Sequence, residues 1–393
     1  MEHNVGLNSV NRTVLVGISY GVDSFVAKNL LKDKGYEVYE CNLDINSDEF
    51  KKIKKHFVDA YINALTPNIC TYCNRHFKFF ELNKKREKLG LDFYATGHYA
   101  NVIYTDGRYA IKKSKNENKD QSYMLYNLTQ AELSHLILPI SDMDKSEVRR
   151  LAATFEGDIG KEYSQKKDSL DICFIQDKSY VEYIKEYFLG KDYKEKLAAG
   201  ELKKEDIEKF YFLRRGKIVR ASDNVGVSLR ARSLNNVEAS PKNPMVIAYH
   251  DGIINFTVGQ RLYIDGNITD LYVNNIDKNT LDVVVDKKEN LYVNEFNVGD
   301  INYMLLDKWT GSQAHPYELQ TGSLTTVRLR RAHPYITANV KTTYRGEEVK
   351  CECIFTNENE AHIKLFTPLI VSKGQAAVFY DDEGIILFGG IIM

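Results

Sequence analysis

The sequence predicts an α/β N-terminal domain with a parallel sheet, followed by two small, mainly β domains. The prediction depends on a change in the pattern of apolar residues along the chain. From Thr13 to about Leu189, short apolar runs alternate with helical stretches, as in strands joined by crossover helices. From about Phe210 onward, short β-branched runs alternate with turns, a spacing that favours small β-barrels. A length of 393 residues suits two or three domains, each with its own core.

The first half begins with a strand, a loop and a helix. Residues 13–18 (TVLVGI) predict a buried strand, residues 19–24 a loop, and residues 25–34 a helix that ends at Gly35. Further along, we expect strands over 37–43 and 93–95, a basic helix over 74–88, and helices over 130–136, 145–155 and 180–189.

The second half begins after a charged segment, 190–209, which we expect to be a helical connector. The predicted strands there cover 217–220, 252–258, 270–275, 281–285 and 324–330. Neither internal repeats nor low-complexity tracts occur in the sequence.

Composition excludes several classes of protein. Lys and Arg number 53 against 54 Asp and Glu, so the whole chain does not attract polyanions. The longest apolar run, 384–393, falls well short of the roughly 20 residues that a membrane helix needs, and the polar start lacks a secretory signal. Six cysteines are too few for a disulfide scaffold. We therefore expect a cytoplasmic protein with reduced thiols, with no membrane partner.

Positive charge is concentrated in two places. Residues 75–119 hold eleven Lys and Arg against five Asp and Glu, and residues 321–350 hold six against two. Each patch could be a solvated face and nothing more. Two basic patches on different domains would also suit a phosphate backbone that runs across both.

The segment from Gly17 to Ser24 lies between the first strand and the first helix. Such a loop offers backbone N–H groups and a helix N-terminus, which together attract an anion. A plain turn capped by Asp23 or Ser24 is the alternative. No Gly-Lys-Ser/Thr follows, so this is not the P-loop of nucleoside triphosphatases.

Three further motifs contain reactive residue types. Cys70 and Cys73 precede the basic helix, where they could be reactive thiols beside Arg75, zinc ligands with His76, or inert buried side chains. Cys173 stands in an apolar stretch and could be a core thiol or a reactive one. Residues 118–123 (NKDQSY) group a cation, an acid and an amide ahead of a helix, and could also be a surface cap.

Taken together and in order, the motifs resemble the tRNA-specific 2-thiouridylases of the MnmA type. The resemblance spans nearly the whole chain and is carried by SYGVDS (19–24), TPNICTYCN (66–74), ATGHYA (95–100), KDQSY (119–123), KKDSLDICFI (166–175), FTVGQR (256–261) and GQAAVFY (374–380) with the later Gly389 and Gly390.

The resemblance implies a fold and an activity. The fold is a PP-loop domain, similar to adenine nucleotide α-hydrolases, over 1–189, a connector with a small central β domain over 190–265, and a C-terminal β-barrel over 266–393. The activity is ATP-dependent tRNA thiolation, by an enzyme that adenylates the C2 oxygen of the wobble uridine (U34) with ATP and Mg²⁺ and replaces it with sulfur from a cysteine persulfide. The implied partners are tRNA and a sulfur-donor or relay protein.

The resemblance also assigns roles to residues of this sequence. It implies that Cys173 carries the persulfide and that Cys73 is its catalytic partner, with a transient disulfide between them. The implied nucleotide-binding residues are Gly17, Ile18, Ser19, Tyr20, Gly21, Val22, Asp23, Ser24, Leu43 and Gly97. The residues implied to contact tRNA are Asn68, Ile69, Cys70, His98, Lys119, Asp120, Gln121, Arg330, Arg331 and Gln375. It implies no resident metal.

The sequence differs from the family's sequence pattern in three places. Tyr20 stands where the family has Gly, and we expect it to block a positive φ and to crowd a phosphate. The segment from Asp44 to Thr66 is short, and Ile69 replaces a proline. An alternative hypothesis is therefore a catalytically impaired paralogue that acts as an RNA-binding or regulatory module.

Overall fold

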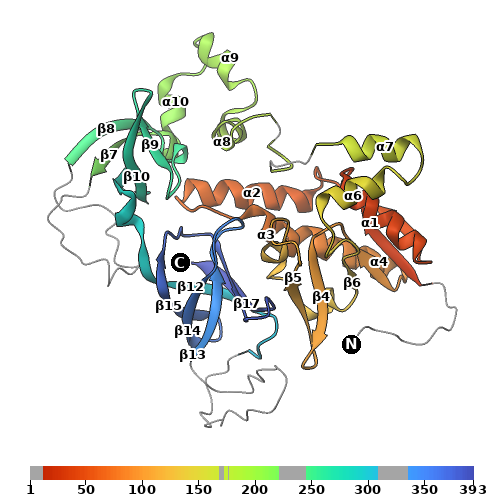
Figure 1. Cartoon of the computed structure of the whole chain (residues 1–393). Coiled ribbons are helices and arrows are strands. Elements are labelled where there is room, and N and C mark those ends of the chain that lie inside the picture. The colour runs from red at the N-terminus through yellow and green to blue at the C-terminus, as the bar shows by residue number, and fades with distance from the viewer. Residues whose placement is uncertain (1–11, 168–171, 176, 221–244, 309–334) are drawn as a thin grey trace. The chain divides into compact units, whose positions relative to one another are not determined.

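The computed structural model describes residues 12–167, 172–175, 177–220, 245–308 and 335–393. Figure 1 labels their helices and strands. They fall into two compact units. The first unit comprises Met1–Phe50, Thr71–Leu170 and Glu383–Ile386, and the second comprises Lys51–Cys70, Asp171–Asp382 and Leu387–Met393. None of the helices in the described ranges is both long enough and apolar enough to cross a membrane.

The first unit is built on a four-stranded parallel sheet. Its strands stand in the order β2 (Glu37–Cys41), β1 (Thr13–Gly17), β3 (Phe93–Ala95) and β6 (Leu136–Ile137). The predicted parallel sheet and its first three strands are thereby confirmed. β6 begins at the last residue of the helix expected over 130–136, because α5 ends at Leu133 and the chain then pairs with β3.

Helices cover both faces of this sheet. Val14 and Val16 of β1 pack with Leu31 of α1 (Val22–Asp33), since alternate residues of a strand share a face. On the opposite face, a Cβ at Gly17 would lie 3.0 Å from Leu82 of α4 (Phe79–Leu89). The architecture is thus the doubly wound α/β type.

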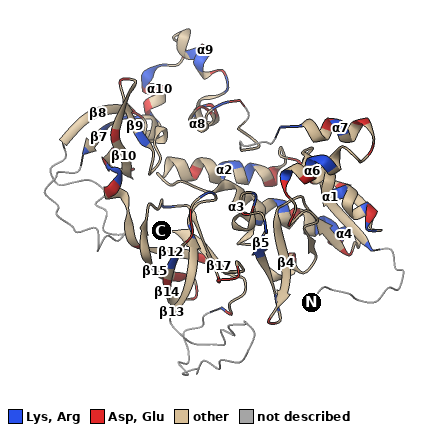
Figure 2. Ribbon diagram, viewed as in Figure 1, with Lys and Arg blue, Asp and Glu red and all other residues tan. Residues whose placement is uncertain are grey.

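The remaining helices of the N-terminal half are α2 (Asp48–Ile62), α3 (Ile69–Cys73), a π-helix (Asn74–Lys78), a 3-10 helix (Ser122–Leu125), α5 (Gln130–Leu133), α6 (Lys145–Ala152) and α7 (Asp158–Gln165). Of these, α5 and α6 begin where helices were expected, whereas α2, α3 and α7 were not predicted. The basic helix expected over 74–88 is α-helical only from Phe79, since its first five residues form the wider π turn. Figure 2 shows Lys and Arg along α4.

A two-stranded hairpin also belongs to the first unit. β4 (Ala100–Thr105) and β5 (Arg108–Lys113) pair in antiparallel register around Asp106 and Gly107. Both turn residues have positive φ, 51° and 78°, as a tight hairpin turn requires.

The second unit contains the charged connector, which is helical as predicted. α8 (Tyr180–Leu189) is followed by α9 (Tyr193–Ala198), α10 (Lys204–Glu208) and a 3-10 turn (Tyr211–Leu213). Gly190, at φ 91°, ends α8.

A five-stranded sheet comes next. Its order is β8 (Met245–Asp251), β7 (Arg215–Arg220), β11 (Asp282–Lys287), β10 (Asn267–Asp277) and β9 (Arg261–Ile264). The strand expected over 252–258 is instead a 3-10 turn, Ile253–Asn255, because Asn255 donates hydrogen bonds to the carbonyls of Asp251 and Gly252. The domain boundary expected after residue 265 falls between β9 and β10, and the domain limits stay predictions.

The chain ends in a closed six-stranded barrel, as the predicted fold class requires. Its strands follow the order β12 (Val293–Tyr303), β15 (Glu360–Leu369), β14 (Val349–Asn357), β13 (Tyr335–Lys341), β16 (Ala376–Tyr380) and β17 (Ile386–Ile392). The strand expected over 324–330 lies outside the described residues. A 3-10 turn, Lys288–Leu291, precedes the barrel.

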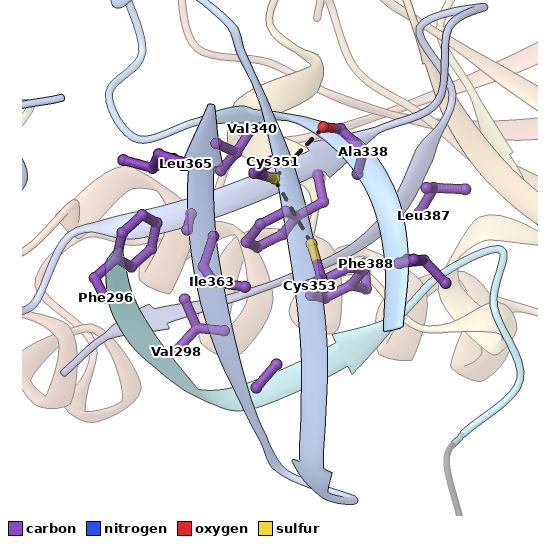
Figure 3. Close-up of a cluster of buried hydrophobic side chains, with 14 of the residues drawn as sticks. Phe296, Val298, Ala338, Val340, Cys351, Cys353, Ile363, Leu365, Leu387 and Phe388 are labelled. Carbon is purple, nitrogen blue, oxygen red and sulfur yellow. Dashed lines mark hydrogen bonds between the residues drawn. The ribbon is translucent and has the colours of Figure 1, made fainter. Parts of the chain in front are cut away.

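Alternating side chains fill the barrel interior (Figure 3). On β14, Cys351 and Cys353 both point inward, with their sulfurs 3.7 Å apart and no exposed surface. Burial raises the pKa of the Cys353 thiol well above its usual range. These two cysteines are therefore apolar core residues.

The barrel core allows a stability prediction. Phe388 is fully buried and stacks on Phe379 with ring centroids 4.2 Å apart. We expect Phe388→Ala to lower the free energy of unfolding by about 3–5 kcal/mol, measured by urea denaturation, because the surrounding core relaxes only partly around the cavity. Phe366→Ala, at a position 64% exposed, is the control and should change it by less than about 0.5 kcal/mol. Equal effects would contradict this packing.

Candidate nucleotide-binding edge and cysteine sites

Three predicted nucleotide-binding segments meet at one edge of the parallel sheet. β1 is paired on one side with β2, where Gly17 lies opposite Cys41, and on the other with β3, where Val16 lies opposite Ala95. Because the strands are parallel, the segments that follow them all leave from the same edge. In doubly wound sheets, ligands bind outside the carboxyl ends of strands, where neighbouring crossovers diverge.

Three hydrogen bonds hold the loop after β1 in place. The N–H of Ile18 donates to Cys41 at 2.8 Å, which fixes the loop to the end of β2. The Ser24 hydroxyl accepts from the N–H of Ser19 at 3.2 Å and donates to the carbonyl of Gly21 at 3.1 Å. Gly21 is the N-cap of α1 and supplies no side-chain acceptor to the first-turn N–H groups. This helix end can therefore attract an anion.

Tyr20 adopts the conformation that we expected it to prevent. Its φ is 57°, in the left-handed region that glycine occupies without strain. Its hydroxyl accepts a hydrogen bond from Asn42, just after β2, at 3.0 Å, and its carbonyl accepts one from Lys166 at 3.5 Å. The expectation that Tyr20 blocks a positive φ is therefore wrong, because these contacts help hold the strained turn.

Gly97 is required by a close approach of two segments. A Cβ there would lie 2.6 Å from the carbonyl carbon of Asp23 and 2.8 Å from the nitrogen of Ser24, a distance that backbone atoms cannot accommodate. The loop after β3 thus touches the first turn of α1. Leu43, the other predicted residue of this edge, is half-buried two residues after β2.

The Asp23 carboxylate is bound by two residues that the sequence analysis did not single out. The Lys145 ammonium donates to both oxygens of Asp23 at 2.8 and 2.9 Å, and the Tyr99 hydroxyl donates at 2.5 Å. Lys145 is in place because Asp144 caps the N-terminus of α6. Asp144 and Lys145 can be recognised in the sequence as the start of an amphipathic helix, but Asp23, with which Lys145 pairs, lies 122 residues away.

His98 follows Gly97 and is held beside the basic helix. Its Nδ1 atom lies 2.8 Å from the Thr96 hydroxyl, and its ring lies 5.4 Å from that of Phe79. Burial, and secondarily the positive charge of Lys78, hold the pKa of His98 well below its usual range. The imidazole is therefore neutral at neutral pH.

The predicted tRNA contacts Lys119, Asp120 and Gln121 form a fixed loop. Asp120 is buried, and its carboxylate accepts from the N–H of Ser114 at 2.9 Å and the hydroxyl of Ser122 at 2.7 Å. Gln121 exchanges hydrogen bonds with the backbone of Tyr99 at 2.8 and 3.0 Å. Both residues thus shape the loop, while a tRNA contact by this segment stays a prediction.

Cys73 lies where the backbone changes from α3 to the π-helix. It is half-buried, and the next residue, Asn74, is buried and donates to the carbonyl of Met124 at 2.8 Å. Arg75 pairs with the buried Glu132 at 2.9 Å. Single π turns are frequent at functional sites. The described residues contain no group of three or more His, Cys, Asp or Glu side chains suited to a metal ion.

Cys173 is exposed, and the residues that follow it are anchored. The Phe174 ring lies 5.5 Å from that of Phe57 in α2 and 5.2 Å from that of Tyr183 in α8, and Ile175 is buried. The alternative that Cys173 is a packed core thiol is therefore wrong. Phe174, the next residue, packs against the rings of Phe57 and Tyr183, so the Cys173 thiol can face solvent.

Two sets of predicted tRNA contacts in the second unit, one at the start of α3 and one in the loop before β16, are joined by a backbone contact. The N–H of Thr66 donates to the carbonyl of Lys373 at 2.9 Å, and a Cβ at Gly374 would lie 3.0 Å from Leu65. This contact joins the chain leading to Asn68, Ile69 and Cys70 to the loop of Gln375. Cys70 is exposed and Ile69 is buried, so the turn presents its cysteine outward. Arg330 and Arg331 lie outside the described residues.

Comparison with known proteins identifies two regions of the chain. The model of a tRNA methyl transferase HUP domain matches residues 43–177, and that of an aminomethyltransferase beta-barrel domain matches residues 319–392. Among similar proteins, the tRNA-specific 2-thiouridylase MnmA of Clostridium acetobutylicum is 29% identical over 98% of this chain and 100% of its own. MnmA 1 of Clostridium tetani is 30% identical, with 98% of each chain covered, and MnmA of Clostridium perfringens is 30% identical over 97% and 98%.

A HUP-type α/β domain joined to a C-terminal β-barrel defines the class of protein. Within that class, the chain belongs to the family of tRNA-specific 2-thiouridylases. The alignment with the Clostridium acetobutylicum protein runs to 425 positions, more than the 393 residues of this chain, so that relative carries residues which this chain lacks.

The Asp23–Lys145 pair is open to a direct test. Lys145→Met should lower the free energy of unfolding by about 1–3 kcal/mol, since it leaves a partly buried carboxylate without its cation. Lys115→Met is the matched control, because Lys115 pairs with Asp142 while 83% exposed, and should cost less than about 0.5 kcal/mol. Thermal and urea denaturation would measure both. Equal costs would show that the Asp23 pair is no stronger than a surface pair.

Thiol accessibility tests the placement of the cysteines. Native protein treated with iodoacetamide near pH 8 should be alkylated at Cys70 and Cys173 within minutes, because both are exposed. Cys351 and Cys353 should react only after unfolding, since both are fully buried. Quantitative peptide mass spectrometry would record the rates. Slow alkylation of Cys173, or fast alkylation of Cys353, would contradict the described environments.

Proposed function

We propose that the chain is an ATP-dependent tRNA-uridine 2-sulfurtransferase that converts U34 of tRNA to 2-thiouridine. The observation that carries the proposal is the exposed Cys173 thiol on a segment anchored through Phe174 and Ile175. A cysteine that must accept sulfur from one protein and deliver it to an RNA base has to be both accessible and fixed in place. Membership of the tRNA-specific 2-thiouridylase family supports the same assignment.

The edge of the parallel sheet suits a nucleotide. The first-turn N–H groups of α1 receive no side-chain cap from Gly21. The backbone of Gly97 lies against the same turn, where a residue with a Cβ would clash with the backbone of Asp23 and Ser24. We propose that residues 17–24 hold the phosphates, with Leu43 and Gly97 beside the nucleoside. Mg²⁺ commonly binds through phosphates and one or two carboxylates, and it would reach the Asp23 carboxylate by replacing the Lys145 ammonium, which bonds both of its oxygens. The bound nucleotide supplies the adenylate that makes the C2 oxygen of uracil a leaving group.

Sulfur transfer is then a sequence of two displacements. The terminal sulfur of a persulfide on Cys173 forms a bond to C2 as the bond from C2 to the activated oxygen breaks, and AMP leaves with the electron pair. The Cys73 thiolate next attacks Sγ of Cys173, so the sulfur–sulfur bond breaks, a Cys73–Cys173 disulfide forms and the thiolated base is released. A thiol reductant restores the two cysteines, and a sulfur-donor or relay protein reloads Cys173.

Recognition of tRNA is assigned to loops of both units. A base inside an anticodon stack has to flip out before C2 can be reached. We propose that Asn68, Ile69, Cys70 and Gln375 contact the flipped region, and that His98 and residues 119–121 contact its surroundings. Loops and backbone contacts are the usual means of recognising folded RNA. In this proposal, residues 1–189 bind nucleotide and carry the chemistry, residues 190–265 connect, and residues 266–393 form a domain that contacts tRNA.

The test is mass spectrometry of tRNA nucleosides from a host that lacks its own thiouridylase. Expression of the chain should restore 2-thiouridine. Cys173→Ser should abolish it while leaving tRNA affinity, measured by a filter-binding or mobility-shift assay, within about twofold. Cys353→Ala is the matched control, because that thiol lies in the barrel core, and should retain the product. Retained 2-thiouridine in Cys173→Ser would refute the persulfide role.

A second outcome distinguishes the alternative function. If soluble, folded protein binds tRNA but yields no 2-thiouridine, an RNA-binding or regulatory role replaces catalysis. The observation that favours this alternative is the positive φ of Tyr20, a backbone conformation that favours glycine.

A further inference from the structure

Tyr20 has a backbone conformation that the fold would obtain more easily with glycine. The described non-glycine residues with positive φ are Tyr20, Ala64, Asp106, Glu156, Asp177, Asp265, Leu281 and Asp300, among which Tyr20 alone is aromatic. A left-handed conformation is unfavourable for a residue with a Cβ, because the Cβ comes too close to the following carbonyl oxygen. Strain of this kind collects at functional positions, and an observed outlier is a reason to look for a function.

The ring of Tyr20 does not offset that strain by burial. The residue is 60% exposed, so most of its aromatic surface faces solvent. Other aromatic residues beside it pack as expected: Phe25 stacks on Tyr163 with centroids 4.3 Å apart, and the Lys166 ammonium lies 3.9 Å above the Tyr163 ring. The Tyr20 side chain instead keeps most of its surface exposed.

Hydrogen bonds at two places fix the position of Tyr20. Asn42 donates to its hydroxyl at 3.0 Å, and Lys166 donates to its carbonyl at 3.5 Å. Because Asn42 follows β2 and Tyr20 follows β1, the side chain runs from one strand end to the next. A ring held in this way loses little conformational entropy when a planar ligand stacks on it.

The same edge is where the nucleotide is proposed to bind. An anion at the N-terminus of α1 lies against residues 21–24, and Leu43 is the residue after Asn42. A planar base attached to that anion can reach an exposed ring in the same loop. Stacking on an aromatic side chain stabilises a bound base and accepts any base, since every base has a π face.

We propose that Tyr20 is a nucleobase-stacking residue of this site, with Asn42 as the residue that positions its ring. This inference rests on the proposed function, because it assumes that a nucleotide binds at the edge of the sheet. The ring contributes affinity for the base, and the loop backbone contributes affinity for the phosphates. Tyr20 thereby raises selectivity for a nucleoside triphosphate over inorganic polyphosphate.

Isothermal titration calorimetry on the full-length chain separates these two contributions. The ligands are ATP with Mg²⁺ and inorganic tripolyphosphate with Mg²⁺, which lacks a base. Tyr20→Gly removes the ring and relieves the strain, so we expect ATP to bind about 5- to 30-fold more weakly, equivalent to about 1–2 kcal/mol, with tripolyphosphate affinity unchanged. Tyr20→Phe keeps the ring and should weaken ATP binding less than about threefold.

A tyrosine outside the proposed site serves as the control. Tyr104, a tyrosine of the β4–β5 hairpin that is 55% exposed, provides the control: Tyr104→Ala should leave ATP affinity unchanged. Equal or tighter ATP binding by Tyr20→Gly would overturn the inference and show that the ring crowds the site. A loss of tRNA affinity at constant ATP affinity would overturn it too, by assigning the ring to RNA. If the wild-type chain binds no ATP, the proposed ATP-dependent function fails together with the inference.

Discussion

Parallel pairing of β1 with β2 on one side and with β3 on the other is the constraint on which the first unit depends. It places three loops at one edge, so residues 18–24, 42–43 and 96–98 become neighbours although they are far apart in sequence. The close approach at Gly97 and the hydrogen bond from Ile18 to Cys41 then leave little freedom in those loops. This edge, formed by the topology, is where the nucleotide is proposed to bind.

The two candidate sulfur-handling cysteines have different surroundings, and the difference has a packing explanation. Cys173 is exposed because Phe174 takes the buried position in an aromatic cluster with Phe57 and Tyr183. Cys73 is half-buried at the start of a π turn whose neighbouring residue, Asn74, is bonded to another segment. One thiol is therefore suited to exchange with an external donor, and the other to a protected step.

Charge at the sheet edge is balanced locally. Lys145 and Tyr99 bind Asp23, while Lys166 lies beside the carbonyl of Tyr20. An anion that approaches α1 therefore meets a neutralised carboxylate and an additional cation, in place of an uncompensated negative charge. Many Lys and Arg of the basic patch are also paired, such as Arg75 with Glu132, so sequence counts overstate the charge available to a polyanion.

The sequence by itself determined the fold class, the order of the first strands and helices, and the motifs that mark the family. These features are local or periodic: TVLVGI is apolar enough to be a central strand, and Gly35 and Gly190 end helices wherever those helices lie. Tertiary structure decided what depends on distant partners. It began the basic helix with a π turn, paired Lys145 with Asp23, exposed Cys173 and held Tyr20 at φ 57°. In each case a contact between residues remote in sequence outweighed a local preference of at most a few kcal/mol, and local patterns carry no record of such contacts.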